Sequence, residues 1–211
     1  MTRTKLLVSI VVPLVLGGIP YAVATQEEAF RVGPNGTKAL FTLGMLLGLP
    51  AIASPVVLLL SFVGLFFRKT RWASALVALG TISYLVAFLV SLRRCESIRM
   101  KAFHQLAERS QPLVAAIREF ELKNGRPPGS LNELVPGFLP GIPGTGMGAY
   151  PQYQYLTNPV VYQGNPWVLA IDTPSGGINF DKFLYFPKTN YPHEGYGGRL
   201  ERVGDWAYVH E

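Results

Sequence analysis

The sequence predicts an α+β membrane protein with two or three N-terminal transmembrane helices, a long spine helix and a small antiparallel β-meander packed on that helix. Three observations lead to this fold class. The chain is apolar almost throughout Leu6–Leu92, an amphipathic segment follows over Arg93–Asn124, and short β-like runs between Gly, Pro and Asn residues fill the rest. Apolar runs of about 20 residues suit bilayer spans, and short strands between tight turns suit an antiparallel sheet.

Composition divides the chain into a transmembrane region, residues 1–92, and an extracytoplasmic head, residues 93–211. Hydrophobic residues make up 49% of the chain and charged residues only 15%, with a net charge of +6. Lys and Arg outnumber Asp and Glu by 14 to 6 up to Asn124, and are outnumbered 5 to 7 after it. The head therefore lacks the basic surface that nucleic-acid binding requires. A single cysteine excludes an intrachain disulfide, so the head depends on its own core.

Three apolar stretches are candidate spans, at residues 6–24, 39–67 and 72–92. The first has two interpretations, an uncleaved helix or a signal peptide cut after Ala22-Val23-Ala24. Pro50 and Pro55 are expected to kink or tilt the second. Basic residues at the N-terminus and in the Arg68–Arg71 turn favour the cytoplasm, which places the head on the opposite side of the membrane. We expect a multi-pass protein of a bacterial inner (cytoplasmic) membrane.

The spine helix is expected over 93–124, because apolar residues recur there at three- and four-residue spacings. Pro112 leaves two alternatives, a fresh helix capped by Ser110 or Gln111 or one long kinked helix. Gly125 is expected at the left-handed position just after the helix. The apolar residues of this pattern are Ile98, Ala102, Leu106, Leu113, Ile117 and Phe120.

The remainder is expected to form a short helical turn and a small sheet. Ser130-Leu131-Asn132-Glu133 matches a capping box that opens one helical turn. Leu113, Ile117 and Phe120 are expected to pack on strands bearing Trp167 and Trp206, which together form the head core. The expected strands are Tyr153–Thr157, Val160–Gln163, Trp167–Asp172, Lys182–Phe186, Arg199–Val203 and Trp206–His210.

The segment from Leu113 to Pro136 resembles type IV pilin-like proteins, especially the pseudopilins of type II secretion. The similarity lies in Phe120, in the turn Asn124-Gly125-Arg126-Pro127-Pro128, and in Leu131 followed by Leu134-Val135-Pro136. The resemblance implies a long N-terminal helix, half membrane anchor and half spine, with a small antiparallel sheet packed on it. It covers only the C-terminal half of the chain.

The N-terminal half departs from that family. The resemblance implies a short leader ending in Gly, followed by Phe-Thr-Leu-x-Glu. Phe41-Thr42-Leu43 is present, but Leu40 replaces the Gly and Met45 the Glu, and the tripeptide precedes the wrong helix. We therefore expect no prepilin processing and no polymerisation through the spine.

Residues with reactive or ligating side chains are scattered. His104, His193 and His210 lack the spacing of a helical zinc site, and Cys95 has no base near it in the sequence. Asp172, Asp181 and Asp205 are isolated, whereas calcium requires six to eight oxygen ligands, so turn hydrogen bonding is expected of them. We expect no catalytic residues, no cofactor and no metal.

Four basic residues, Arg93, Arg94, Arg99 and Lys101, are expected at the membrane surface, where they contact lipid headgroups. The expected function is that of a non-enzymatic envelope protein whose head binds another, unknown envelope protein, with a secretion or pilus-like apparatus as the expected setting. The expected partners include the lipid bilayer, but no nucleic acid and no small-molecule substrate. The alternative function is a ligand-sensing head that signals to the membrane through the spine.

Overall fold

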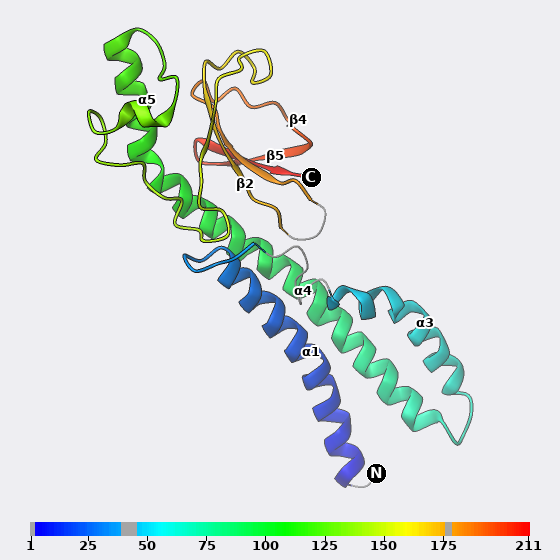
Figure 1. Ribbon diagram of the computed structural model, residues 1–211. Helices are drawn as coiled ribbons and strands as arrows, with labels where there is room; N and C mark the ends of the chain where they lie inside the picture. Colours follow the sequence, from blue (N-terminus) through cyan, green and yellow to red (C-terminus); the bar gives the residue numbers. More distant parts are fainter. Residues whose placement is uncertain (1–2, 39–45, 176–178) are drawn as a thin grey trace. The chain divides into compact units, whose positions relative to one another are not determined.

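The computed structural model describes residues 3–38, 46–175 and 179–211. These residues form an α+β chain (Figure 1) that divides into two compact units. The first unit contains Met1–Ala29 and Phe41–Ile98, and the second contains Phe30–Leu40 and Arg99–Glu211. The segment 30–40, which follows α1, thus belongs to the same unit as the sheet. The helices are α1 (Arg3–Arg31), α3 (Gly48–Gly64), α4 (Arg71–Arg109), α5 (Gln111–Asn124) and the 3-10 helix η1 (Leu131–Leu134).

Within the first unit, α1 and α4 pack side by side and parallel. The Lys5 ammonium lies 5.3 Å from the centre of the Trp72 ring, near the start of both helices. Further along, a Cβ on Gly17 would lie 3.3 Å from the Ser83 carbonyl oxygen. Towards the other end, the Cys95 thiol donates to the Ala24 carbonyl oxygen at 3.5 Å. Residue numbers rise together along the two helices, so both run in the same direction.

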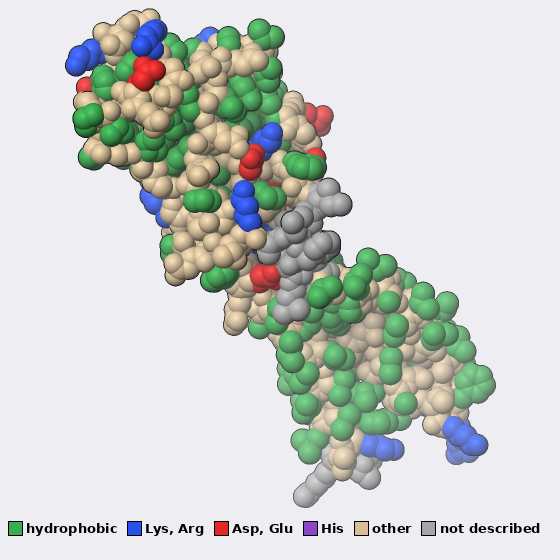
Figure 2. All heavy atoms as spheres, in the orientation of Figure 1, with side chains coloured by type: hydrophobic (Ala, Val, Ile, Leu, Met, Phe, Trp, Pro, Cys, Tyr) green, Lys and Arg blue, Asp and Glu red, His purple; other side chains and the backbone are tan. Residues whose placement is uncertain are grey.

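Helix α3 runs antiparallel to α4. The Tyr84 hydroxyl donates to the carbonyl oxygen of Leu47, just before α3, while Gly64 at the end of α3 lies against Ser74 near the start of α4. The turn after α3 is fixed by Arg71, whose Nε donates to the Leu65 carbonyl oxygen at 3.1 Å. Figure 2 shows hydrophobic side chains over most of the visible surface of this unit, with Lys and Arg gathered at the chain start and at this turn.

Among the described residues, two helical stretches are long and apolar enough to cross a bilayer, Thr4–Arg31 and Arg71–Asn124. Of the stretch 39–67, expected as a span of 29 residues, the structure describes residues 46–67, where α3 accounts for 17. At 1.5 Å per residue α3 is about 25 Å long, short of a hydrocarbon core of about 30 Å. The described part of the chain therefore contains two helices of spanning length and one shorter helix. The tripeptide Phe41–Leu43 lies outside the described residues.

The spine is one long bent helical run, in which α5 follows α4 after a single residue. Ser110 keeps helical backbone angles, its N–H donates to the Leu106 carbonyl, and its own carbonyl accepts from Val114. Pro112 stands in the first turn of α5, where its missing N–H costs no hydrogen bond. Gly125 ends α5 with a φ of 67°, which confirms the glycine cap.

The expected capping box at η1 is only half present. Ser130 makes no side-chain cap hydrogen bond. The Glu133 carboxylate instead accepts from the backbone N–H of Gly129 at 2.8 Å and from Arg126 at 3.2 Å. The short turn after the spine is thus tied to the Arg126 loop by a carboxylate rather than by reciprocal caps.

The second unit contains a six-stranded antiparallel sheet with the order β1-β2-β3-β6-β5-β4. It is two three-stranded meanders joined by β3 and β6 rather than one continuous meander. The expected strand Val160–Gln163 is a turn, and β4 falls in a Gly- and Tyr-rich segment where no strand was expected. The strands are β1 (Gln154–Leu156), β2 (Val168–Asp172), β3 (Lys182–Tyr185), β4 (Glu194–Gly195), β5 (Gly198–Val203) and β6 (Trp206–His210).

One face of the sheet packs on the helices through aromatic rings. Phe103 of α4 stacks on Phe183 at 4.7 Å and contacts Tyr208 at 4.8 Å. From Phe183 the ring contacts continue through Trp206 and Tyr185 to Trp167 and Tyr155. Offset and tilted ring pairs at these separations stabilise beyond the area they bury. Buried in this layer or beside it are all five expected core residues, Leu113, Ile117, Phe120, Trp167 and Trp206.

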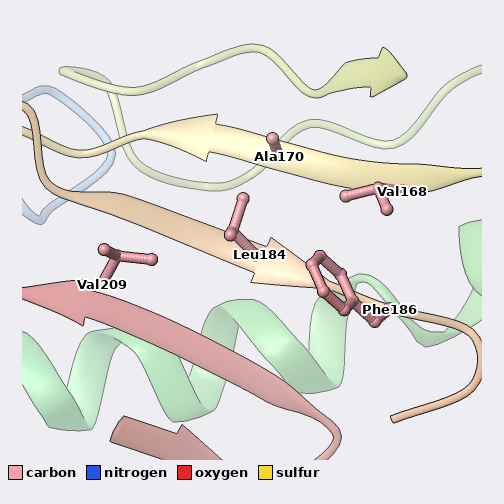
Figure 3. Packing of buried hydrophobic residues seen from close by; sticks show 5 residues of the cluster. All are labelled: Val168, Ala170, Leu184, Phe186 and Val209. Carbon is pink, nitrogen blue, oxygen red and sulfur yellow. The ribbon is translucent and has the colours of Figure 1, made fainter. Parts of the chain in front are cut away.

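The opposite face is covered by tyrosine-rich loops. Its buried cluster consists of Val168, Ala170, Leu184, Phe186 and Val209, whose side chains Figure 3 shows along β2, β3 and β6. The Phe186 ring stacks on Tyr191 at 4.7 Å and meets Tyr196 edge-on at 5.5 Å. These loop tyrosines account for part of the tyrosine excess in the sequence. The sheet is therefore buried on both faces.

Segment 30–40 attaches to the second unit through a close backbone approach. The N–H of Gly148 donates to the Gly33 carbonyl oxygen at 2.8 Å. A Cβ on Gly148 would lie 2.5 Å from the carbonyl oxygens of Pro34 and Gly36, which is closer than real Cβ atoms come. Only glycine fits at this position without displacing the 33–36 turn.

Gly148→Ala is therefore expected to loosen segment 30–40 at a cost of about 1–3 kcal/mol, as for other overpacked sites. Limited trypsinolysis of the detergent-solubilised chain should then cut faster at Arg31, which is only 7% exposed in the folded chain. Gly141→Ala is the matched control, because a Cβ there would meet nothing within 4 Å. Equal cleavage rates in the two variants would contradict this account of Gly148.

Candidate functional site

The most polar buried site of the second unit is the pair formed by Arg99 of α4 and Asp181, which precedes β3. Arg99 Nη1 lies 3.6 Å from Asp181 Oδ2, and the two side chains are 5% and 4% exposed. The same guanidinium nitrogen donates to the Thr173 carbonyl oxygen at 3.1 Å and lies 3.3 Å from the Tyr208 hydroxyl. A charge this deeply buried is tolerated only when it is paired and hydrogen-bonded.

The Asp181 carboxylate also accepts hydrogen bonds from three other residues. Tyr208 Oη donates to Oδ2 at 2.6 Å, Asn179 Nδ2 donates to the same oxygen at 2.9 Å, and the Glu211 backbone N–H donates to Oδ1 at 3.0 Å. We call Arg99, Asp181 and these three donors the Arg99–Asp181 cluster. It joins α4 to β6 and to the segment that precedes β3.

The contacts of this cluster suit a structural link between helix and sheet. The carboxylate faces a guanidinium, a phenol, a side-chain amide and a backbone N–H, and these groups occupy the positions that a substrate of an acid–base catalyst would need. Burial raises the pKa of the Tyr208 hydroxyl, so this group remains a neutral donor at physiological pH. The arrangement fixes the spine to the sheet.

A shallow polar hollow of about 360 Å³ lies at the edge of the same unit. It is lined by Lys38, Tyr150, Gln152, Gln154 and Asp172, with Gly148, Ala149 and Pro151. Gln154 Nε2 donates to Asp172 Oδ2 at 2.5 Å across it. The hollow offers one cation, one carboxylate and amide groups, a set that suits a small polar ligand more than catalysis.

The histidines and the cysteine are not brought together. His210 Nε2 lies 2.8 Å from Glu201 across β5 and β6, His193 is exposed beside Glu194, and His104 is exposed on α4. No group of three His, Cys, Asp or Glu residues with metal-ligating geometry occurs among the described residues. Asp172 and Asp181 lie in the two sites above, and Asp205 accepts from Tyr191 through its backbone carbonyl.

The four basic residues expected at the membrane surface separate into two kinds. Arg93, Arg94 and Lys101 are exposed, whereas Arg99 is buried in the ion pair with Asp181. The expectation for Arg99 is thus corrected: its charge serves the core of the second unit. The spacing of residues in the sequence indicates this burial. Arg99 lies on the same helix face as the buried residues Phe103 and Leu106, at i, i+4 and i+7.

Phe103 itself, the aromatic centre of the helix–sheet contact, was absent from the expected core. Its ring partners, Phe183 and Tyr208, lie far away in the sequence, so no local pattern indicates the contact. The expected contact residues, Leu113, Ile117 and Phe120, all lie on α5, but the last turns of α4 share that role through Phe103 and Arg99.

No family model matches the chain, and no curated protein or solved structure is significantly similar to it. The observed arrangement nevertheless agrees in outline with the pilin-like expectation: a long apolar N-terminal helix, a long bent helix and a small antiparallel sheet. That agreement concerns architecture only.

The tyrosine-rich core makes the second unit sensitive to alkali. Burial raises the pKa of Tyr208, Tyr191 and Tyr155 above the ordinary value of about 10. Because the folded state then favours the protonated phenol, these groups contribute their full stabilisation to the folded state below about pH 10. This contribution to the free energy of unfolding is lost as the pH rises further.

We therefore expect the second unit to unfold cooperatively above about pH 10, with the tyrosinate absorbance appearing together with the loss of near-ultraviolet circular dichroism. The measurement is a pH titration of the detergent-solubilised chain that follows both signals. Titration of all tyrosines near pH 10 with the dichroism unchanged would contradict the burial argument.

Proposed function

We propose that this chain is a multi-pass protein of a bacterial inner membrane that holds a pilin-like interaction module, the second unit, on the extracytoplasmic side. The parallel packing of α1 and α4 carries the proposal. The starts of both helices bear the basic residues Lys5, Arg71 and their neighbours, and both helices continue at their far ends into the second unit. Basic residues favour the cytoplasmic side, so the two helices cross in the same direction.

A parallel pair requires the chain to return between its two members. The segment that contains α3 supplies that return, because α3 runs antiparallel to α4 and its exposed side chains are apolar. Its apolar side chains, such as Ile52 and Leu60 at 78% and 66% exposed, suit contact with hydrocarbon. The membrane unit then has two spanning helices and one shorter returning segment.

The second unit acts in this proposal by binding another envelope protein, within a secretion or pilus-like apparatus. Its ionisable core groups are engaged in the Arg99–Asp181 cluster, and its surface carries isolated exposed apolar side chains such as Leu122 and Val160, which are 87% and 93% exposed. Both are available for contact with a partner. Co-purification of secretion or pilus components with the tagged chain supports this role, and their absence from such a preparation counts against it.

The topology can be tested with single cysteines in a Cys95→Ser background. Lys188→Cys in the second unit should react with a membrane-impermeant maleimide in intact cells, whereas Lys69→Cys in the α3–α4 turn should react only after lysis. Both positions are exposed, so the protein fold does not hinder labelling. The reverse pattern, or labelling of both sites in intact cells, would rule out the proposed orientation.

A second candidate function is supported by the hollow at Lys38 and Asp172 and by the continuity of α4. Helix α4 runs from Arg71 in the first unit to Arg109 in the second without interruption. A small polar ligand bound in the hollow could therefore signal to the membrane through this helix. A ligand-dependent rise in the melting temperature of the full chain favours the sensor, and Asp172→Asn should abolish that rise.

A further inference from the structure

The basic end of the first unit combines four exposed cationic side chains with aromatic and backbone contacts. Lys5, Arg68, Lys69 and Arg71 are all exposed there, in the regions where Figure 2 shows Lys and Arg at the chain start and at the α3–α4 turn. Lys5 lies over the Trp72 ring, an arrangement that places this indole beside a cation. Tryptophan beside lysine is typical of the level of lipid headgroups.

No carboxylate opposes this positive charge. The sequence contains no Asp or Glu between Lys5 and Gln26, and none between Phe41 and Cys95. The acidic residues of the first unit, Glu27, Glu28 and Glu96, all lie at the far ends of α1 and α4. An anion at the basic end therefore meets attraction only.

An apolar groove of about 390 Å³ opens between the three helices of the same unit. Small side chains line its α3 wall at Ala53 and Ser54. On the opposite wall Leu16 of α1 packs directly on Gly80 of α4, where a Cβ would lie 2.8 Å from Leu16 Cδ1. Tyr84 lies at the far end of its α4 wall. The complete lining is Val12, Leu16, Pro50, Ala53, Ser54, Val57, Leu76, Val77, Gly80, Thr81 and Tyr84.

The groove starts close to the basic end. Leu76 is five residues beyond Arg71 on α4, and Val12 is seven beyond Lys5 on α1, which are separations of about 8 and 11 Å at 1.5 Å per residue. The lining on α4 then extends over eight residues to Tyr84, about 12 Å. A molecule with an anionic group joined to a hydrocarbon chain matches both the charge and the apolar shape.

We propose that the first unit binds an anionic phospholipid at this end. Its phosphodiester lies beside Lys5 and Arg71, which the contact between Lys5 and Trp72 brings to the same end, and one acyl chain enters the groove between α1, α3 and α4. Arg68 and Lys69 add positive charge at the adjoining turn. This inference rests on the proposed membrane insertion of the first unit.

The test uses the full chain in nanodiscs containing equal amounts of phosphatidylglycerol and phosphatidylcholine, with native mass spectrometry of the released protein. The expected result is retention of phosphatidylglycerol in preference to phosphatidylcholine. Lys5→Gln combined with Arg71→Gln should reduce that preference on the order of tenfold, given the attraction of each basic residue to anionic lipid. The matched control is Lys188→Gln with Arg199→Gln, which removes two exposed charges from the second unit and should leave the preference unchanged.

A second pair of variants tests the groove. Ala53→Leu fills the lining and should reduce the number of retained lipids, whereas Ala75→Leu, at an exposed position of α4 outside the lining, should not. Glycerol phosphate, which has no acyl chain, is the soluble probe. If it displaces phosphatidylglycerol completely, the site recognises a free phosphate and the acyl-chain assignment is wrong.

Equal retention of the two lipids, or loss of preference in the Lys188/Arg199 control as well, overturns the proposed site. Both results can be distinguished from a failure of the proposed function. If the first unit does not cross the bilayer, the chain is recovered outside the nanodiscs. Alkaline carbonate, which removes proteins that do not cross the bilayer, then also extracts it from cell membranes.

Discussion

Asp181→Ala is expected to lower the free energy of unfolding of the second unit by about 3–5 kcal/mol, because it leaves the Arg99 guanidinium buried without its carboxylate. No other group can take the place of the missing carboxylate. Arg99 is 4% exposed, so water cannot replace the lost oxygen without opening the contact between α4 and the sheet. The substitution also removes the acceptor of Tyr208, Asn179 and the Glu211 N–H.

The reverse substitution is expected to cost less. In Arg99→Leu the Asp181 carboxylate keeps its three other donors, and the leucine retains part of the apolar contact on α4. The asymmetry between these two variants is the specific signature of the cluster. Asp172→Ala is the matched control, because that carboxylate is only partly buried and should change the free energy of unfolding by less than about 1 kcal/mol.

Urea unfolding of the detergent-solubilised chain, followed by near-ultraviolet circular dichroism, measures these differences. Trp167 and Trp206, both fully buried in the second unit, dominate the signal. If Asp181→Ala and Asp172→Ala unfold at the same urea concentration, the ion pair does not hold the spine to the sheet.

Phe103→Ala is expected to cost about 3–5 kcal/mol, the range for deletion of a buried aromatic side chain. Phe103 is fully buried and contacts Phe183 and Tyr208 on neighbouring strands, so its removal opens a cavity at the centre of the aromatic layer. Neighbouring rings are held in their own stacks and can fill only part of that cavity.

Phe180→Ala removes the same side chain from a position that is 64% exposed, and should change the free energy of unfolding by no more than about 0.5 kcal/mol. The comparison therefore separates burial from residue type. The same unfolding assay applies. Similar losses in the two variants would mean that the last turns of α4 do not pack on β3 and β6.

The sequence was sufficient for features that depend on local chemistry. The glycine cap at Gly125, the position of Pro112 in the first turn of α5 and most strand positions follow from backbone preferences within a few residues. The same reasoning failed at Val160–Gln163, where β-branched and aromatic residues form a turn that carries Tyr162 onto the sheet. There the tertiary contact decided the conformation.

Features that join distant segments could not be predicted. The partner of Arg99 lies 82 positions further along the chain, and Arg99 adjoins other basic residues that favoured a headgroup position. The attachment of segment 30–40 depends on the missing side chain of Gly148, which in the sequence is one of several glycines in a loop. Helix α3 ends at Gly64, three residues before the apolar composition ends at Phe67, because the chain there enters the turn that leads to α4.

The strand order limits how copies of the chain can associate through the edges of the sheet. The two outer strands of the sheet, β1 and β4, contain only three and two residues, while longer strands lie between them. Pro151 and Pro192 stand just before these outer strands and cannot donate backbone hydrogen bonds. Neighbouring copies of the chain therefore find little free backbone with which to extend the sheet, which protects the protein from aggregation through strand addition.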